Sequence, residues 1–333
     1  MKRKLFSPRT DWQLEHQKIG FDYFNLPSLD GSIYWSEGVA YEFTLKQIEQ
    51  LEDAANELHQ MCLAVVGDLI QRGDYPNYFQ IPQAAIPHIE HSWQRNSPML
   101  YGRFDFAYDG LQIKMLEYNA DTPTGLLEAS VAQWLWIEQV SGIPNRDQFN
   151  SIHEDLIKRW KTILPRGSHL HFAACQEAGR EDWGNLEYLM DTAFQAHLQV
   201  SELSMENIGW NGQSFVDLNN RPIQNLFKLY PWEWIWEESF AQYLQPETNW
   251  IEPCWKMLLS NKAILVELWK RYPNHPLLVE TYAYDPEQNF SGKWVKKPIL
   301  AREGANIRVL QDGQDQGAAS GSFYFDDYDK YGY

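Results

Sequence analysis

Apolar residues near the start of the chain recur three and four positions apart, which is the spacing of one helix face. The longest such stripe runs from Ile48 to Leu69 and predicts a long amphipathic helix. Thr44 and Gln47 have the spacing of a capping box at its start. Gly73 follows the last apolar position and predicts the end of the helix.

The pattern becomes strand-like after residue 100. Residues 74–100 are rich in proline and are expected to form an irregular connector, so that residues 1–100 are a mostly helical segment packed on the core. Residues 101–107 and 111–118 are rich in aromatic and aliphatic side chains, and Asp109-Gly110 between them is a strong hairpin signal. We therefore predict a hairpin here, followed by a helical pattern from residue 126 to about 140.

Helical and strand patterns alternate in the middle of the chain. This rhythm predicts a small α/β unit. Its expected helices and strands are 152–163, 169–175, 185–197 and 199–203, followed by a hairpin of 215–218 with 223–229. Later elements are a helix over 262–272 and strands over 293–300 and 307–310. The whole pattern indicates an α+β or α/β protein.

Composition and charge exclude several classes of protein. Of 333 residues, 44% are hydrophobic and 22% are charged, which argues against intrinsic disorder. The formal net charge of −17 disfavours nucleic acid and anionic membrane surfaces as partners. No apolar run approaches the roughly 20 residues that a membrane helix needs. Three widely spaced cysteines fit reduced thiols, so we expect a cytoplasmic protein.

The hairpin carries the most informative polar residues. On a strand, residues two apart share a face. Two carboxylates, an amide oxygen and a guanidinium on one face would suit Mg²⁺ together with a phosphate group. The alternative is a solvated face whose charges pair with one another. The residues concerned are Arg103, Asp105, Glu117 and Asn119.

The turn decides whether Asp105 and Glu117 share a face. A two-residue Asp109-Gly110 turn would put Asp105 opposite Lys114 and leave Glu117 on the other face. A three-residue loop over 108–110 would instead place both carboxylates on one face. Both registers are open from the residues alone, and a metal site requires a loop or bulge with an odd number of residues.

A second group of candidate residues is basic and lies late in the chain. In an otherwise acidic protein, a lysine-bearing strand followed by a glycine turn can present cations and backbone N–H groups to phosphates. No Walker sequence GxxxxGK[ST] occurs, and an edge strand blunted by lysines is the alternative. The group comprises Lys262, Lys296, Lys297, Arg302 and the turn Glu303-Gly304.

Several long motifs together resemble a known family. They are Gly102-Arg-Phe-Asp-Phe-Ala-Tyr-Asp, Leu116-Glu-Tyr-Asn-Ala-Asp-Thr-Pro-Thr, Asn261-Lys-Ala-Ile-Leu, Val295-Lys-Lys-Pro-Ile and Arg302-Glu-Gly-Ala-Asn. The chain resembles the synthetase domain of glutathionylspermidine synthetase and its stand-alone acid–amine ligase relatives. The resemblance implies an ATP-grasp fold of the glutathione-synthetase type with permuted order. It implies a core of residues 101–148 and 250–333, with a small α/β substrate domain inserted over 149–249.

The resemblance also implies a function. Family members form amides from a carboxylate and an amine through an acyl-phosphate, using ATP and Mg²⁺. By residue, it assigns Mg²⁺ to Asp105, Glu117 and Asn119, the transferring phosphoryl group to Arg103, and ATP to Arg103, Asp105, Lys262, Lys297, Glu303 and Gly304. Of the adjacent lysines, only Lys297 is expected to face the nucleotide.

For the substrates, the resemblance is less complete. It places Thr122, Thr124, Glu181 and Asp182 near them. Gly125 stands where the glutathione-using members have a cysteine, and Leu229 stands where they have a threonine, so the acid and the amine are not assigned. Relatives also continue past a segment like 331–333, which suggests that a C-terminal part of the fold is missing. The alternative function is a catalytically degenerate homologue that binds nucleotide or a peptide-like ligand as a sensor or partner protein.

Overall fold

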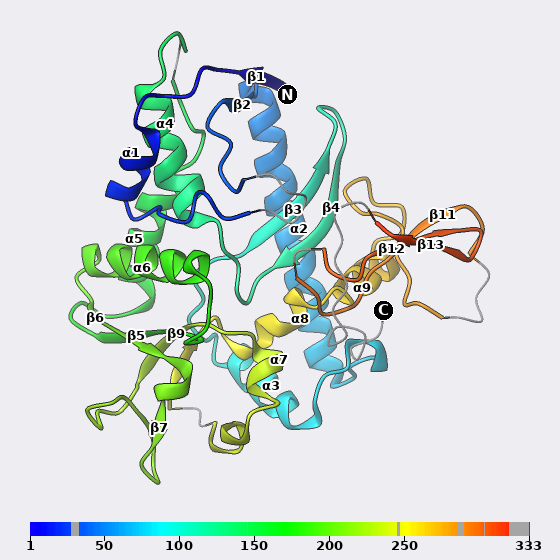
Figure 1. Cartoon of the computed structure of the whole chain (residues 1–333). Coiled ribbons are helices and arrows are strands. Elements are labelled where there is room, and N and C mark those ends of the chain that lie inside the picture. Colours follow the sequence, from blue (N-terminus) through cyan, green and yellow to red (C-terminus); the bar gives the residue numbers. More distant parts are fainter. Residues whose placement is uncertain (28–32, 145, 245–246, 286–289, 303, 320–332) are drawn as a thin grey trace.

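The computed structural model describes residues 1–27, 33–144, 146–244, 247–285, 290–302, 304–319 and 333. It is a mixed α/β structure with a parallel sheet (Figure 1). The helices are α1 (Trp12–Lys18), α2 (Leu45–Arg72), α3 (Ile86–Gln94), α4 (Gln133–Gln139), α5 (Ile152–Ile163), α6 (Arg180–Gln195), α7 (Trp232–Ile235), α8 (Met257–Ser260) and α9 (Ile264–Arg271).

Among the described residues, the strands form one four-stranded sheet, one three-stranded sheet and three two-stranded sheets. They are β1 (Lys2–Leu5), β2 (Val39–Glu42), β3 (Arg103–Tyr108), β4 (Ile113–Asn119), β5 (His169–Ala174), β6 (Gln199–Ser204), β7 (Gly209–Trp210), β8 (Phe215–Val216), β9 (Asn225–Leu229), β10 (Asn249–Ile251), β11 (Lys293–Lys296), β12 (Arg308–Gln311) and β13 (Gln314–Ala318). Among the residues described, no helix is long and apolar enough to cross a membrane.

The predicted long helix is confirmed as α2. The Thr44 hydroxyl accepts the Gln47 backbone N–H, and the Gln47 side chain accepts the Thr44 N–H, which completes the capping box. Gly73 ends the helix in the left-handed conformation, with φ of 61°. The apolar stripe of α2, including Leu58 and Leu69, is buried in one of two hydrophobic clusters.

Replacing Thr44 with alanine is expected to lower the free energy of unfolding by about 1 kcal/mol, because the helix loses its N-cap acceptor. Urea denaturation measures this. Thr162→Ala is the matched control, since its hydroxyl only bonds back to the Lys158 carbonyl within α5. An equal loss in both variants would contradict a specific role for the cap.

The stretch 74–100 is more regular than expected. It contains α3, whose first turn includes Pro87. The expectation of an irregular connector was therefore wrong for residues 86–94. The physical reason is that proline is tolerated in the first turn of a helix, where its missing N–H would have no intrahelical partner.

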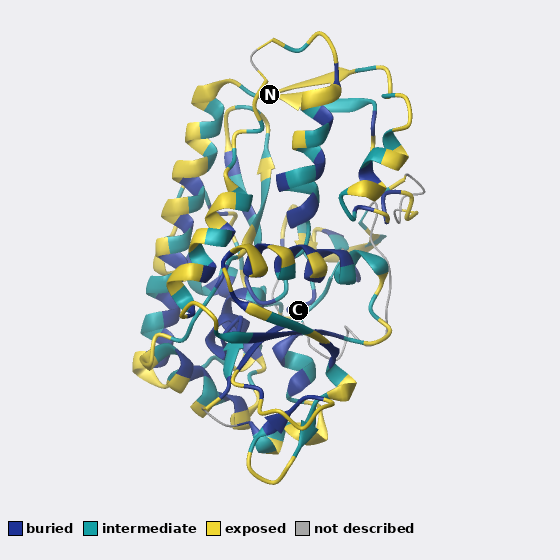
Figure 2. Cartoon of the chain, turned by 90° about the vertical axis from the view of Figure 1, so that its left-hand side faces the viewer, coloured by how far each residue is buried: buried dark blue, intermediate teal, exposed yellow. Residues whose placement is uncertain are grey.

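The parallel sheet has the order β10-β9-β5-β6. Its residues alternate between the two hydrophobic clusters: Phe172 packs on the α5–α6 side and Ala173 on the α2 side. Burial on both faces is typical of parallel strands. The inner strands β5 and β9 are almost wholly buried, and in Figure 2 the sheet lies beneath helices with exposed outer turns. The predicted 215–218/223–229 hairpin is confirmed only next to its turn, where Val216 bridges to Pro222 and the Ile223 N–H donates to the Phe215 carbonyl at 2.8 Å. Beyond the turn it was wrong, because β8 pairs with β7 while β9 joins the parallel sheet.

The β3–β4 hairpin differs from both predicted turns. Tyr108 pairs with Ile113, so the loop has the four residues 109–112. The Asp109 carboxylate accepts the N–H groups of residues 111 and 112, which stabilises this wider turn. A bulge then leaves Leu116 as an extra residue, because Phe106 pairs with Met115 and Asp105 with Glu117. The predicted odd residue is thus in the strand and not in the loop.

Candidate active site

The β3–β4 hairpin places four polar side chains next to one another. Arg103 lies opposite Asn119, and Asp105 lies opposite Glu117. Arg103 Nε donates to Asp105 Oδ1 at 2.9 Å, and the Asn119 amide donates to Glu117 Oε1 at 3.0 Å. The bulge therefore brings together the four hairpin residues that the sequence singled out.

Lysines from later parts of the chain balance these carboxylates. Lys262 Nζ lies 3.2 Å from Glu117 Oε2 and donates to the Ala301 carbonyl at 2.8 Å. Burial works to raise the pKa of Glu117. The charge of Lys262 and the hydrogen bond from Asn119 outweigh burial, and they hold that pKa below its usual value. Glu117 is therefore kept as a carboxylate.

Burial shifts the pKa values of Asp105 and Lys297 in opposite directions. It raises the pKa of Asp105, although the neighbouring Arg103 opposes the change. It lowers the pKa of Lys297, where Lys262 adds to the effect and Glu117 opposes it. The Asp105 side chain is still 38% exposed, whereas those of Glu117 and Lys262 are 24% and 12% exposed. Carboxylates and ammonium groups held close together and partly shielded from water interact more strongly with a charged ligand than they would in bulk water.

The donor set of the hairpin fits a hard divalent cation. It offers two carboxylates and one amide oxygen, from Asp105, Glu117 and Asn119. Mg²⁺ is bound in proteins by one or two carboxylates, with the remaining positions filled by water and substrate phosphates. The described part of the chain holds no cluster of three or more His, Cys, Asp or Glu side chains suited to a metal.

A cavity of about 460 Å³ adjoins this group on the side of α9 and β11. Its polar wall includes Lys262 and Lys297, and its apolar wall includes Met115, Leu116, Val266, Phe290, Trp294 and Ile299. Lys296 also lines it, with Nζ 4.1 Å from the ring centre of Tyr284 and 3.8 Å from that of Tyr333. The expectation that only one of the two lysines faces this space was wrong. The reason is that β11 ends at Lys296, so strand alternation does not govern Lys297.

The predicted glycine turn at 303–304 is described only in part, because Glu303 lies outside the described residues. Gly304 has φ of 73°, a conformation that a side chain would strain. An added Cβ would meet only Ile307 Cδ1, at 3.7 Å, so the space around it is open. Glycine is therefore favoured here by the backbone conformation of the turn and not by lack of space.

A second, larger cavity of about 920 Å³ adjoins the other end of the hairpin. Arg103 and Thr124 are in its wall, together with residues of α2 and α5. The cavity has both carboxylates and cations, in Glu52, Asp155, Lys158 and Arg159. The hairpin thus borders two separate spaces, one beside the lysines and one beside Arg103.

The expected substrate residues lie at the start of α6 and in the loop after β4. The Thr124 hydroxyl donates to Glu181 Oε1 at 3.0 Å, and burial raises the pKa of Glu181. Asp182 follows in the same first turn of α6. The Thr122 hydroxyl instead accepts a hydrogen bond from Arg302 at 3.0 Å. Thr124 and Glu181 are therefore brought together, while Thr122 connects to the basic turn.

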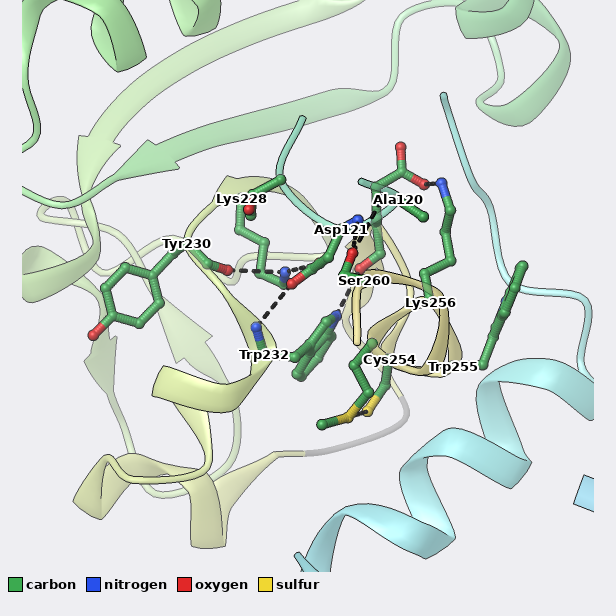
Figure 3. Close-up of polar contacts among 12 residues, drawn as sticks. Ala120, Asp121, Lys228, Tyr230, Trp232, Cys254, Trp255, Lys256 and Ser260 are labelled. Carbon is green, nitrogen blue, oxygen red and sulfur yellow. Dashed lines mark hydrogen bonds and ion pairs between the residues drawn. The ribbon is translucent and has the colours of Figure 1, made fainter. Parts of the chain in front are cut away.

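Sequence reasoning missed a buried network that begins in the segment just after β4 (Figure 3). Lys228 Nζ lies 2.6 Å from Asp121 Oδ1, with side chains 0% and 2% exposed. Ser260 accepts the backbone N–H of both Ala120 and Asp121. A signal was present, because Lys228 interrupts the apolar strand β9 and a buried lysine requires a partner.

The chain matches, over residues 3–332, the family described as "Glutathionylspermidine synthase preATP-grasp". It therefore belongs to that family, as the motifs around Arg103 and Asn119 indicated. Membership groups the chain with enzymes that form amide bonds.

Three curated relatives illustrate the similarity. A "Putative acid–amine ligase" of Haemophilus influenzae is 51% identical, with 100% of this chain and 86% of that protein covered. A "Trypanothione synthetase" of Crithidia fasciculata is 27% identical, with 84% and 46% covered. A "Bifunctional glutathionylspermidine synthetase/amidase" of Escherichia coli is 26% identical, with 83% and 48% covered. The chain thus spans most of the first relative and under half of the other two.

Proposed function

We propose that this protein is an ATP-dependent, Mg²⁺-dependent ligase that joins a carboxylate to an amine. The observation that carries the proposal is the meeting of Asp105, Glu117 and Asn119 with Lys262 at the edge of a cavity. Oxygen ligands facing cations is the arrangement that a metal–nucleotide complex requires. The names of the relatives, all ligases or synthetases, support the same reaction type.

The proposed chemistry has two steps. A carboxylate is a poor acylating agent, so the γ-phosphoryl group of ATP is first transferred to its oxygen, which gives an acyl-phosphate and ADP. The amine nitrogen then attacks the carbonyl carbon, phosphate leaves, and the nitrogen loses a proton to give the amide. Mg²⁺, when bound, neutralises phosphate charge. Lys262 and Lys297 orient the phosphates. Arg103 stabilises the charge on the phosphoryl group during its transfer.

The two cavities divide the proposed ligands. ATP takes the space lined by Lys262, Lys297 and aromatic side chains, within an ATP-grasp fold of permuted order. The acid takes the cavity beside Arg103 and Thr124. Glu181, which accepts the Thr124 hydroxyl, is the carboxylate suited to the amino end of a peptide-like acid. Residues 149–249 form the inserted substrate domain, residues 101–148 and 250–333 form the core, and a polyamine-like molecule is the amine.

Release of ADP tests this function. We expect full-length protein with Mg²⁺ to release ADP faster when a suitable acid and polyamine are both present, because the amine resolves the acyl-phosphate. A coupled ADP assay over a panel of acids and amines measures it, with each substrate alone as control. Nucleotide binding without turnover on any pair would favour the degenerate sensor instead.

Lys297→Ala is expected to weaken ATP binding about ten- to a hundredfold, because a charged hydrogen bond to phosphate is lost. Lys296→Ala is the matched variant. Its ammonium stacks on Tyr284 and Tyr333, so its removal is expected to cost less than about fivefold. Calorimetric titration with ATP and Mg²⁺ measures both. Equal losses would contradict the assignment of Lys297 to the phosphates.

A further inference from the structure

The β3–β4 hairpin depends on its surroundings for a fixed position. Its two strands pair only with each other within the described residues. An isolated two-stranded hairpin is marginally stable. Its apolar face packs, through Met115 and Tyr118, on the hydrophobic cluster that contains the apolar stripe of α2, called the α2 cluster below. Its polar face carries Arg103 and its neighbours, whose relative positions must hold to within a fraction of an ångström for catalysis.

One buried ion pair anchors the chain just after β4. Asp121 Oδ1 accepts from Lys228 Nζ at 2.6 Å, and its Oδ2 accepts the Trp232 N–H at 2.9 Å (Figure 3). Lys228 also donates to the Tyr230 carbonyl and lies 4.7 Å from the Trp232 ring centre. The Ser260 hydroxyl accepts two successive N–H groups of the same segment, at 3.0 and 2.7 Å.

A second buried ion pair anchors the chain just before β3. Glu252 accepts the backbone N–H of Leu100 and of Tyr101, each at 3.0 Å. Lys256 pairs with Glu252, with side chains 2% and 0% exposed, and donates to the Tyr101 carbonyl. Ser260 lies one helical turn beyond Lys256, so one short segment, 252–260, holds both ends of the hairpin.

Stability alone does not account for these charges. Moving an ion pair out of water costs nearly as much as the attraction returns, and apolar residues of similar volume often stabilise a protein as well or better. What a fully hydrogen-bonded buried pair does provide is one defined geometry. The Glu252–Lys256 pair bonds backbone groups of residues 100 and 101, just before β3. The Asp121–Lys228 pair ties Asp121, two residues after the end of β4, to the backbone of residues 230 and 232.

We propose that Asp121–Lys228 and Glu252–Lys256 are positioning pairs that hold the two ends of the β3–β4 hairpin, and so set the mutual placement of Arg103, Asp105, Glu117 and Asn119. This inference rests on the proposed ligase function for its effect on turnover. It also makes a claim about hairpin order that is independent of catalysis.

The test removes one charge pair without leaving its partner unpaired. The double variant Asp121→Asn/Lys228→Met keeps an oxygen that can accept the Trp232 N–H and a side chain that fills the space. Arg9→Met/Glu37→Gln is the matched control, because that ion pair is also buried, at 2.6 Å with side chains 7% and 3% exposed, and binds the α4 region instead. Urea denaturation, kcat, KM for ATP, and amide hydrogen exchange of residues 103–119 are measured for each.

We expect the Asp121/Lys228 variant to lose about ten- to a hundredfold in kcat, as is usual when residues that orient ligands are removed. Its KM for ATP should change less than threefold, and amide exchange in 103–119 should be faster. The control variant should show neither change at a similar loss of stability. Unchanged exchange and kcat in the first variant, or equal changes in both, would overturn the inference.

Two further results keep the test decisive. If the double variant does not fold, Ser260→Ala removes only the acceptor of two N–H groups and Ser260→Thr restores a hydroxyl. Faster exchange and lower kcat in the first, with recovery in the second, support the inference; no difference between them overturns it. If wild-type protein forms no amide, the ligase proposal fails, whereas the exchange comparison still decides the positioning role.

Discussion

Arg103→Ala is expected to lower kcat about a hundred- to a thousandfold while the affinity for ATP changes less than about threefold. The guanidinium lies between Asp105 and the Thr124 carbonyl, at the edge of the cavity proposed for the acid. There it can meet charge that develops on the phosphoryl group during transfer. An interaction that is stronger in the transition state than with bound ATP acts on kcat.

Steady-state kinetics combined with ATP titration separates these two effects. Arg221→Ala is the matched control, because Arg221 also pairs with an aspartate, Asp217, at 2.7 Å but lies in the turn before β9. Arg221→Ala should lower the free energy of unfolding and leave kcat unchanged. Weaker ATP binding in Arg103→Ala at unchanged kcat would make Arg103 a contact to the ground state, and the proposed role would fail.

Local signals gave most helices correctly. The helix α5 has the bounds expected from its apolar spacing, and α2 begins at the predicted capping box, because capping and helical periodicity act within a few residues. The prediction for residues 223–229 was right about the strand, β9, but wrong about its partner. The residues of β9 favour a strand, but the choice between a hairpin partner and β5 is made by packing between distant segments.

In the candidate site, too, local features were predictable and contacts between distant segments were not. Asp105 and Glu117 were recognisable from their spacing and motif, yet the bulge at Leu116 that joins them depends on how β4 packs on the α2 cluster. The pair of Asp121 with Lys228 joins residues 107 positions apart. One sequence shows that a buried lysine needs an anion but not which anion it finds.

Glu117→Gln is expected to abolish most ligase activity by weakening the proposed Mg²⁺ site. The amide keeps the shape of the side chain but removes the charge that a hard cation requires. It also leaves Lys262, 3.2 Å from Glu117, without its anion. Loss of residues that merely orient ligands costs about ten- to a hundredfold in metal affinity, so loss of a ligand should cost at least as much.

The measurement is the Mg²⁺ concentration that gives half-maximal ADP release at saturating ATP. It should rise at least about tenfold in Glu117→Gln and in Asp105→Asn, with part of the lost rate recovered at high Mg²⁺. Glu187→Gln is the matched control, since Glu187 also pairs with a cation, Arg180, at 2.7 Å on the outer side of α6. Its Mg²⁺ requirement should equal that of the wild type. If the two hairpin variants lose rate with an unchanged Mg²⁺ requirement, their carboxylates act on the substrates and not on the metal.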